Sequence, residues 1–288
     1  MDANLPGWVS PAIIAAGFLL LLFAELRWPL RREVESKPRR VARNLAAAGF
    51  AFAALTLLQT PILIPVSRWA IQHRIGLLNL LGLDGPVRVV LGALLLDYTL
   101  WHWHWINHKV PFFWRFHLVH HVDLDLDAST ALRFHFGEFI LSIGYRLLQV
   151  VAIGADPLSV TLWQTLLVAS ILFHHSNLRI PIEMERRLVR LIVTPRMHGI
   201  HHSTYANETN SNWSSLLSVW DYLHRTAQLN VPQDSIVIGV PAYQEKQDVT
   251  LGKVLTLPFE RQRDDWAGLG GAPRERPHDP QDRNELSA

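Results

Sequence analysis

The sequence contains no cysteine among its 288 residues. This absence excludes disulfide bonds, thiolate zinc sites and cysteine-ligated iron–sulfur clusters, so a bound metal ion would need nitrogen or oxygen ligands. Charged residues are also scarce, at 18% of the chain, whereas hydrophobic residues make up 49%. A soluble domain of this length is typically less apolar, and the composition therefore favours a membrane protein. The formal net charge of +2 gives no indication of a nucleic-acid partner.

Long apolar runs are present, and they predict the fold class. Residues 8–24, 45–66 and 87–106 are close to the length of about 20 residues that a helix needs to cross a bilayer. Two shorter runs, 139–153 and 158–173, flank a Gly-Ala-Asp-Pro turn and predict a helical hairpin. We therefore predict an all-α, polytopic membrane protein with about three full spans and a hairpin whose depth in the bilayer the sequence leaves open.

The segment between the first two runs is strongly basic. It contains Arg27, Arg31, Arg32, Lys37, Arg39, Arg40 and Arg43. By the positive-inside rule this segment belongs in the cytoplasm, and the following runs then place every histidine-rich segment on the cytoplasmic face. We expect an integral protein of the cell inner membrane whose histidine-rich region faces the cytoplasm.

Histidine is abundant, with 15 residues. Three clusters stand out: His104 with His108; His117 with His120 and His121; His198 with His201 and His202. Residues three or four apart share one face of a helix, so each cluster can direct two or three imidazoles toward one point. A single pair of this kind is commonly structural. Three clusters on one side of a membrane predict a dinuclear metal site, because eight neutral nitrogen ligands suit two borderline metal ions. His175, at the inner end of the hairpin, is predicted as a further ligand.

Some other polar residues are candidates for supporting roles. Carboxylates are expected to bind the far ring nitrogens of metal-bound histidines, and the candidates in the sequence are Asp97, Asp123, Asp125, Asp127, Glu138 and Asp221. Asp97 lies within an apolar run, where a carboxylate is costly, although it could instead serve a helix–helix hydrogen bond. His135 is ambiguous, because a ligand, a supporting and a headgroup-binding role all suit its position.

In their order and spacing the motifs resemble those of the fatty acid hydroxylase and sterol desaturase superfamily. The similarity covers residues 97–226 and includes His104-xxx-His108, Trp114-Arg115-Phe116-His117-xx-His120-His121, Thr130-Ala131-Leu132-Arg133-Phe134-His135, His175-Ser176-Asn177, Thr194-Pro195-Arg196-Met197-His198-xx-His201-His202 and Trp220-Asp221. The chain departs from the usual pattern at Phe136-Gly137-Glu138, Asn212-Trp213-Ser214 and His224-Arg225-Thr226. These departures leave the choice of substrate open.

The resemblance implies a helical membrane scaffold capped by a cytosolic metal domain. It also implies two iron ions, held by the cluster histidines and His175, and an O2-dependent hydroxylation or desaturation of an aliphatic C–H bond in a lipid or sterol-like substrate from the bilayer. No fused electron-transfer domain is visible in the sequence, so we expect a separate electron-transfer protein as partner. We predict one membrane-embedded domain over residues 1–260 and a polar, disordered tail over residues 261–288.

Three other classes of protein share some of these features. A histidine-rich membrane metal-binding protein or transporter also uses imidazole ligands, but it would place them along a path through the membrane. A membrane cytochrome with bis-histidine haem needs paired histidines on facing spans, whereas most of these histidines lie outside the apolar runs. A metal-dependent hydrolase commonly uses carboxylates with fewer histidines.

Overall fold

The structure is a computed structural model, and it describes residues 7–266 and Arg276. Over these residues it is all-helical, with isolated β-bridges in place of strands. The α-helices are α1 (Val9–Arg27), α2 (Lys37–Ala54), α3 (Thr60–Gln72), α4 (Leu77–Leu80), α5 (Gly85–Lys109), α6 (Pro111–His121), α7 (Phe136–Ile153), α8 (Pro157–His175), α9 (Ile182–Leu188), α10 (Pro195–His201), α11 (Ala206–Thr209), α12 (Val219–His224) and α13 (Leu251–Thr256). A π-helical segment η1 (Leu55–Gln59) joins α2 to α3, and the 3-10 turns are η2 (Thr130–Leu132), η3 (Gln233–Ser235), η4 (Pro241–Tyr243), η5 (Lys246–Val249) and η6 (Leu257–Phe259).

Four stretches of the described chain are helical, long and apolar enough to cross a membrane: Val9–Arg27, Lys37–Leu80, Phe136–Ile153 and Pro157–His175. The prediction of an all-α membrane protein is confirmed. The structure adds two details to the assignment of individual spans. Both helices of the predicted hairpin are long enough to span, with 18 and 19 residues. The run at 87–106 does form the long helix α5, but α5 is not among the four because polar residues such as Arg88, Asp97 and His104 lower its hydropathy.

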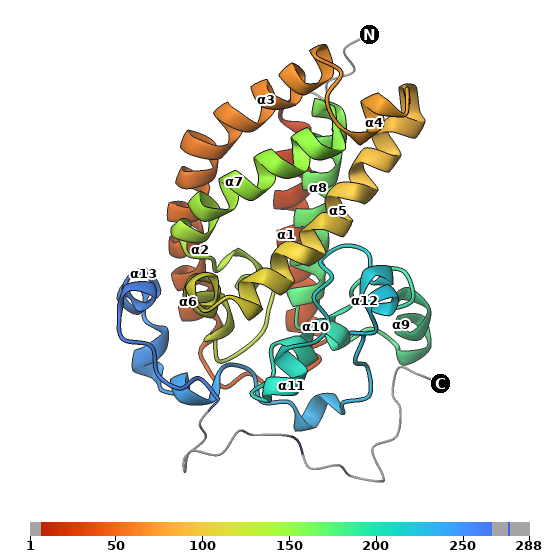
Figure 1. Cartoon of the computed structure of the whole chain (residues 1–288). Coiled ribbons are helices and arrows are strands. Elements are labelled where there is room, and N and C mark those ends of the chain that lie inside the picture. Colours follow the sequence, from red (N-terminus) through yellow and green to blue (C-terminus); the bar gives the residue numbers. More distant parts are fainter. Residues whose placement is uncertain (1–6, 267–275, 277–288) are drawn as a thin grey trace.

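The helix that begins at Lys37 bends where α2 passes into α3 (Figure 1). The five residues of η1 have π-helical hydrogen bonding, and only Thr60 separates them from Pro61. Pro65 lies inside α3, where it donates no backbone hydrogen bond. A π-helical turn next to prolines is a recognised cause of a helix bend, and here the chain bends without ending the helix.

The molecule has two halves (Figure 1). The long helices form one half, and α9 to α13 with their connecting loops form a cap at the other. The core of the helical half contains Leu96, Leu100 and Trp163, which pack α5 against α8. A second core, including Ala47, Leu118 and Leu257, packs α6 against α2 and the C-terminal segment. The histidine-bearing ends of α5 and α8 therefore meet α6 and α10 where the two halves join.

The predicted tail begins with ordered contacts. Arg263 forms an ion pair with Asp248 at 2.7 Å, and Asp265 accepts a hydrogen bond from the Trp114 indole N–H at 2.6 Å. Residues 267–275 and 277–288, which make up most of that predicted tail, lie outside the described residues.

Candidate metal centre

All nine histidines predicted as ligands meet in the structure, and they divide into two groups. The five-histidine group consists of His104, His108, His117, His121 and His201. The four-histidine group consists of His120, His175, His198 and His202. Within each group, one ring nitrogen per residue lies within 4.8 Å of the others. Each group therefore has the size of the ligand shell of one metal ion.

The spacing of the motifs explains how the histidines are shared between the groups. On α6, His117 and His121 lie one turn apart and join the five-histidine group, while His120 points about 100° away and joins the other. At α10, His198 and His202 are also one turn apart and join the four-histidine group, while His201 joins the five-histidine group. Each HxxHH motif thus contributes to both groups, which holds the two groups side by side.

Backbone carbonyls orient four of the nine rings. The Nδ1 atoms of four histidines lie within hydrogen-bond distance of a carbonyl oxygen: His104 with Trp213 at 2.8 Å, His201 with Ser211 at 2.7 Å, His175 with Ile171 at 2.8 Å and His120 with Arg133 at 3.2 Å. A carbonyl only accepts, so each of these Nδ1 atoms carries the proton. The Nε2 atom of the same ring is then left with a free lone pair, as a metal ligand requires.

The ring nitrogens that face one another fit a bound cation. In the five-histidine group, the Nε2 atoms of His108, His117, His121 and His201 are buried and have no hydrogen-bond partner among the described residues. In the four-histidine group, successive Nε2 atoms are 2.9, 3.0 and 3.1 Å apart, in the order His120, His175, His198 and His202. Ligands at about 2.1 Å from a metal ion and at right angles to each other would be about 3.0 Å apart. Both groups therefore suit a metal ion that takes nitrogen ligands.

Burial keeps several of these imidazoles neutral. Desolvation, followed by the neighbouring histidines, holds the pKa of His121, His198 and His202 well below its usual value of 6.5. Burial likewise lowers the pKa of His201 to about 3. Neutral rings at physiological pH are ready to bind a metal ion without first releasing a proton.

One carboxylate reaches a ring of the site directly. Glu138, in the first turn of α7, lies 3.2 Å from His117 Nδ1. His135, three residues earlier, is in neither group. Its Nδ1 accepts a hydrogen bond from the Gly137 N–H at 2.9 Å and so caps the N-terminus of α7. Of the carboxylates considered as partners of the ligand rings, Glu138 is the one that contacts a ring.

Asp221 acts on the site through a loop. It accepts hydrogen bonds from the Trp101 indole, the Trp213 and Ser214 amides and the Thr226 hydroxyl, at 2.6 to 3.0 Å. The carbonyl of Trp213 in turn faces His104. Asp97 accepts from the Trp220 indole at 2.6 Å and from the Leu217 amide at 3.2 Å. Neither carboxylate contacts a ligand ring, and both fix the segment that does.

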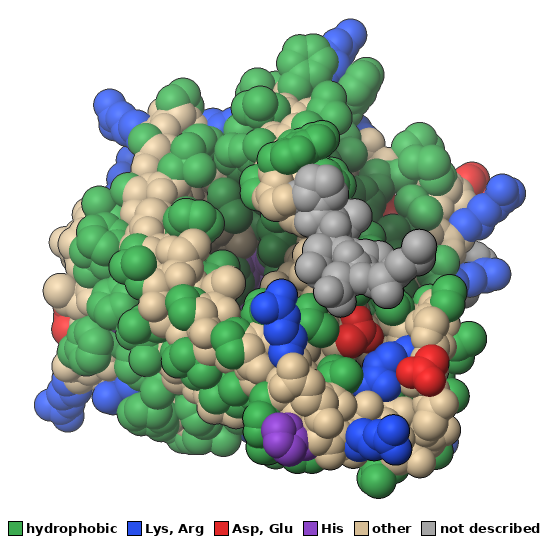
Figure 2. All heavy atoms as spheres, turned by 90° about the horizontal axis from the view of Figure 1, so that it is seen from above, with side chains coloured by type: hydrophobic (Ala, Val, Ile, Leu, Met, Phe, Trp, Pro, Cys, Tyr) green, Lys and Arg blue, Asp and Glu red, His purple; other side chains and the backbone are tan. Residues whose placement is uncertain are grey.

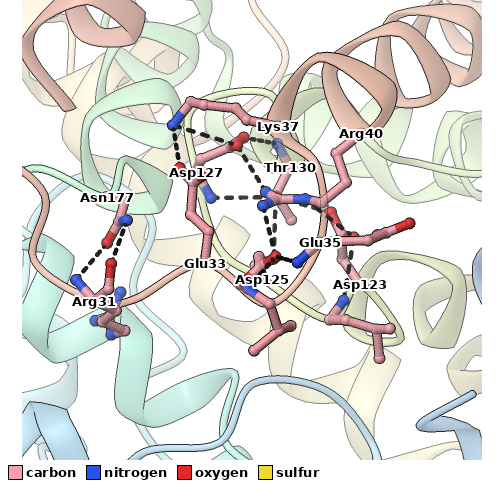
Figure 3. A network of polar contacts seen from close by, with 12 residues as sticks. Arg31, Glu33, Glu35, Lys37, Arg40, Asp123, Asp125, Asp127, Thr130 and Asn177 are labelled. Carbon is pink, nitrogen blue, oxygen red and sulfur yellow. Dashed lines mark hydrogen bonds and ion pairs between the residues drawn. The ribbon is translucent and has the colours of Figure 1, made fainter. Parts of the chain in front are cut away.

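A buried ion-pair network holds the loop that follows α6 (Figure 3). Arg40 on α2 contacts Asp127 at 2.7 Å, Asp125 at 3.0 Å and Asp123 at 3.6 Å. All four side chains are buried. Because this loop leads to Arg133, whose carbonyl faces His120, the network restrains a ring of the four-histidine group from outside the site.

A small cavity of about 220 Å³ reaches the site from the cap. His108 lines it together with Trp114, Asn210, Asp265 and Trp266. Burial raises the pKa of Asp265 to about 6. Through this cavity His108, one of the predicted metal ligands, lies close to the protein surface.

Comparison with known proteins places this site in a family context. Residues 89–226 match the family described as fatty acid hydroxylase. The matched segment begins on α5 and ends just after α12, so it contains all nine histidines of the two groups. The resemblance predicted from the motifs is confirmed.

The chain aligns with only part of each of these relatives. The chain is 35% identical over 176 residues to the ornithine lipid hydroxylase OlsE of Rhizobium tropici, covering 60% of this chain and 51% of that protein. It is 26% identical over 135 residues to the cholesterol 25-hydroxylase of Mus musculus (46% and 44%), and 26% identical over 137 residues to that of Homo sapiens (46% and 48%). The chain thus spans about half the length of these curated relatives. No solved structure is significantly similar to it.

Proposed function

We propose that the chain is a membrane di-iron oxygenase that hydroxylates an aliphatic C–H bond of a lipid or sterol-like substrate, because residues 89–226 match the fatty acid hydroxylase family. The observation that carries the proposal is the convergence of nine histidines into two adjacent groups. The net reaction consumes dioxygen, two electrons and two protons, and it yields an alcohol and water. Desaturation by the same centre is the alternative outcome, and the named relatives, all hydroxylases, favour hydroxylation.

The five-histidine group would hold one iron ion and the four-histidine group the other. When bound, the iron pair supplies the activation of dioxygen that the side chains themselves cannot provide. The protein's part is to orient the rings through the carbonyls of Trp213, Ser211 and Arg133 and to keep the rings neutral by burial. The helices around the centre also exclude water from the reacting carbon.

The substrate would come from the bilayer. The ornithine lipid and cholesterol in the names of the relatives are both membrane lipids, and the helical half of this chain exposes large apolar side chains such as Leu19, Phe52 and Leu148.

Electrons would come from a separate electron-transfer protein. Such a protein would approach the centre at the cavity that His108 and Trp114 line together with Asn210 of the cap.

We further propose that the protein resides in the cell inner membrane with the metal centre on the cytoplasmic side. Support comes from the basic residues that follow α1 and continue into the first turns of α2. Arg32 and Arg39 are exposed there, at the same end of the helical half as the histidine-bearing helix ends.

Metal content and labelled oxygen test the proposal together. The wild-type protein, purified in detergent and reconstituted with ferrous iron, should hold about two irons per chain, and His120→Ala should hold fewer. His73→Ala is the matched control, because His73 is an exposed histidine far from both groups. A lipid extract incubated with the protein, reductant and labelled dioxygen should gain labelled hydroxyl groups. A wild-type protein that retains zinc but refuses iron would instead favour a transporter or a hydrolase.

A further inference from the structure

Arg146 is a charged residue in the middle of α7, one of the helices that can cross the membrane. The lipid-facing side of α7 is marked by Ile140, Gly144 and Leu148, which are exposed and spaced four residues apart. Arg146 is two residues from both Gly144 and Leu148, and so it lies about 200° around the helix from that stripe. The arginine therefore faces the interior of the helical bundle.

Its contacts confirm that orientation. The Arg146 guanidinium carbon lies 5.2 Å from the ring centroid of Trp163, and Trp163 is only 1% exposed within the core between α5 and α8. The Nε and Nη1 atoms of Arg146 are buried and have no hydrogen-bond partner among the described residues. A cation–π contact offsets part of the desolvation of a guanidinium, but it leaves those N–H groups unsatisfied.

No carboxylate of the described chain forms an ion pair with Arg146. The acidic residue on its own face of α7 is Glu138, because residues 138, 142 and 146 lie on one helical stripe. Glu138 is eight residues away, about 12 Å along the axis, so its charge acts on Arg146 without an ion-pair contact, and its carboxylate already contacts His117. A charged side chain inside a membrane bundle is costly, and a guanidinium with two unsatisfied buried nitrogens and no carboxylate in ion-pair contact indicates a ligand that supplies the paired charge.

We propose that Arg146 binds an anionic group, a carboxylate or a phosphate, of the lipid substrate inside the helical bundle, with Trp163 packed against the guanidinium. This inference rests on the proposed function and narrows its substrate to lipids that carry an anion. The stripe from Glu138 to Arg146 leads from the metal centre to the anion site. Figure 2 shows that the end of the molecule where α3 and α4 lie is hollowed between the helices and bordered by hydrophobic side chains.

The helices also give the distance from the anion site to the reacting carbon. Arg146 is about 12 Å from Glu138 along α7, and Trp163 is about 18 Å from His175 along α8. An extended chain advances about 1.2 Å per bond, so the oxidised carbon should lie roughly 10 to 15 bonds from the anion. A lipid with a neutral end would not be held at Arg146, so the position of its oxidised carbon would not be fixed by this distance.

Equilibrium binding of three probes with the same alkyl chain tests the proposal: palmitate, cetyl phosphate and cetyl alcohol. With the detergent-purified protein, both anions or one of them should bind at least about tenfold more tightly than the alcohol, and the stronger anion identifies the source of the charge. Arg146→Gln should remove the preference and leave alcohol binding unchanged. Arg146→Lys should retain part of it, because the charge remains. Arg68→Gln, at an exposed arginine on α3, is the matched control.

Two outcomes overturn the inference: a wild-type protein that binds the alcohol as tightly as the anions, or an Arg146→Gln protein that keeps the preference. If Arg146→Gln fails to fold, the wild-type preference and the Arg146→Lys protein still decide the question. The proposed function fails separately, through the metal count. If the protein takes up no iron but prefers the anions, the anion site is supported and the proposed oxygenase function is contradicted.

Discussion

The two histidine groups are built in different ways. Four members of the five-histidine group come from residues 104–121, on two consecutive helices, and only His201 comes from elsewhere. The four-histidine group draws its members from α6, from the end of α8, and from α10 and the residue after it, between residues 120 and 202. Helical spacing therefore determines most of the first group, whereas tertiary packing must assemble the second.

The segment after α1 supplies part of that packing. The backbone N–H and C=O of Arg31 both bond to the Asn177 side chain, at 2.8 and 2.9 Å, two residues after His175 (Figure 3). The Arg31 guanidinium donates to the Pro195 carbonyl at 2.7 Å and lies against Gly199 of α10. Arg31 thus connects α8 to α10, the two helices that bring His175 and His198 together.

The largest effect should come from removing one ligand of either group. We expect His175→Ala to reduce the iron content from about two to about one per chain, and His117→Ala to do the same by emptying the other group. Both variants should lose the proposed hydroxylation entirely, because the proposed di-iron reaction needs both ions. Elemental analysis of the purified variants beside wild type measures this. Loss of both ions from a single substitution would show that the two groups do not bind metal independently.

A smaller effect should follow from Glu138→Gln. The carboxylate is 3.2 Å from His117 Nδ1, and an amide in its place keeps the shape but removes the negative charge. Loss of such a partner typically lowers metal affinity by about 10- to 100-fold. Competition with a chelator should show weaker binding of one iron and unchanged binding of the other, since no ring of the four-histidine group contacts Glu138. Equal weakening of both ions would contradict the separation of the groups.

Gly199→Ala tests the tertiary contact that supports the four-histidine group. A Cβ atom at residue 199 would lie 1.8 Å from Arg31 Nη2, so the guanidinium or α10 must move. Overpacking of this kind costs about 1–3 kcal/mol, and we expect a loss of iron affinity of about tenfold, mainly in the four-histidine group. The double variant Arg31→Ala with Gly199→Ala removes the clash and should recover part of the loss relative to Gly199→Ala alone. A double variant weaker than both single variants would contradict steric displacement as the cause.

The difference between helical spacing and tertiary packing also explains which parts of the site could be predicted from the sequence. Spacing on α5 and α6 identifies His104, His108, His117 and His121 because a helix places them on one face. The support from Trp213, Ser211 and Arg133 had no sequence signal, because every residue has a carbonyl and only the fold decides which one faces a ring. Arg31 and Gly199 were equally hidden, since their contact joins segments 168 positions apart. The apolar runs alone left the depth of the hairpin open, because each hairpin helix extends past its apolar run into other residues, such as Glu138 on α7 and His174 and His175 on α8.

The smallest effect on metal binding should come from His135→Ala, although His135 lies within the histidine motifs. Its Nδ1 accepts from the Gly137 amide, and its ring belongs to neither group. Loss of an N-cap typically costs about 1 kcal/mol, so denaturant unfolding should show slightly lower stability. The iron content should stay at about two per chain, in contrast to His117→Ala. If His135→Ala also loses an iron, the first turn of α7 transmits the lost cap to Glu138 and hence to His117, and the five-histidine group depends on tertiary packing as much as the four-histidine group does.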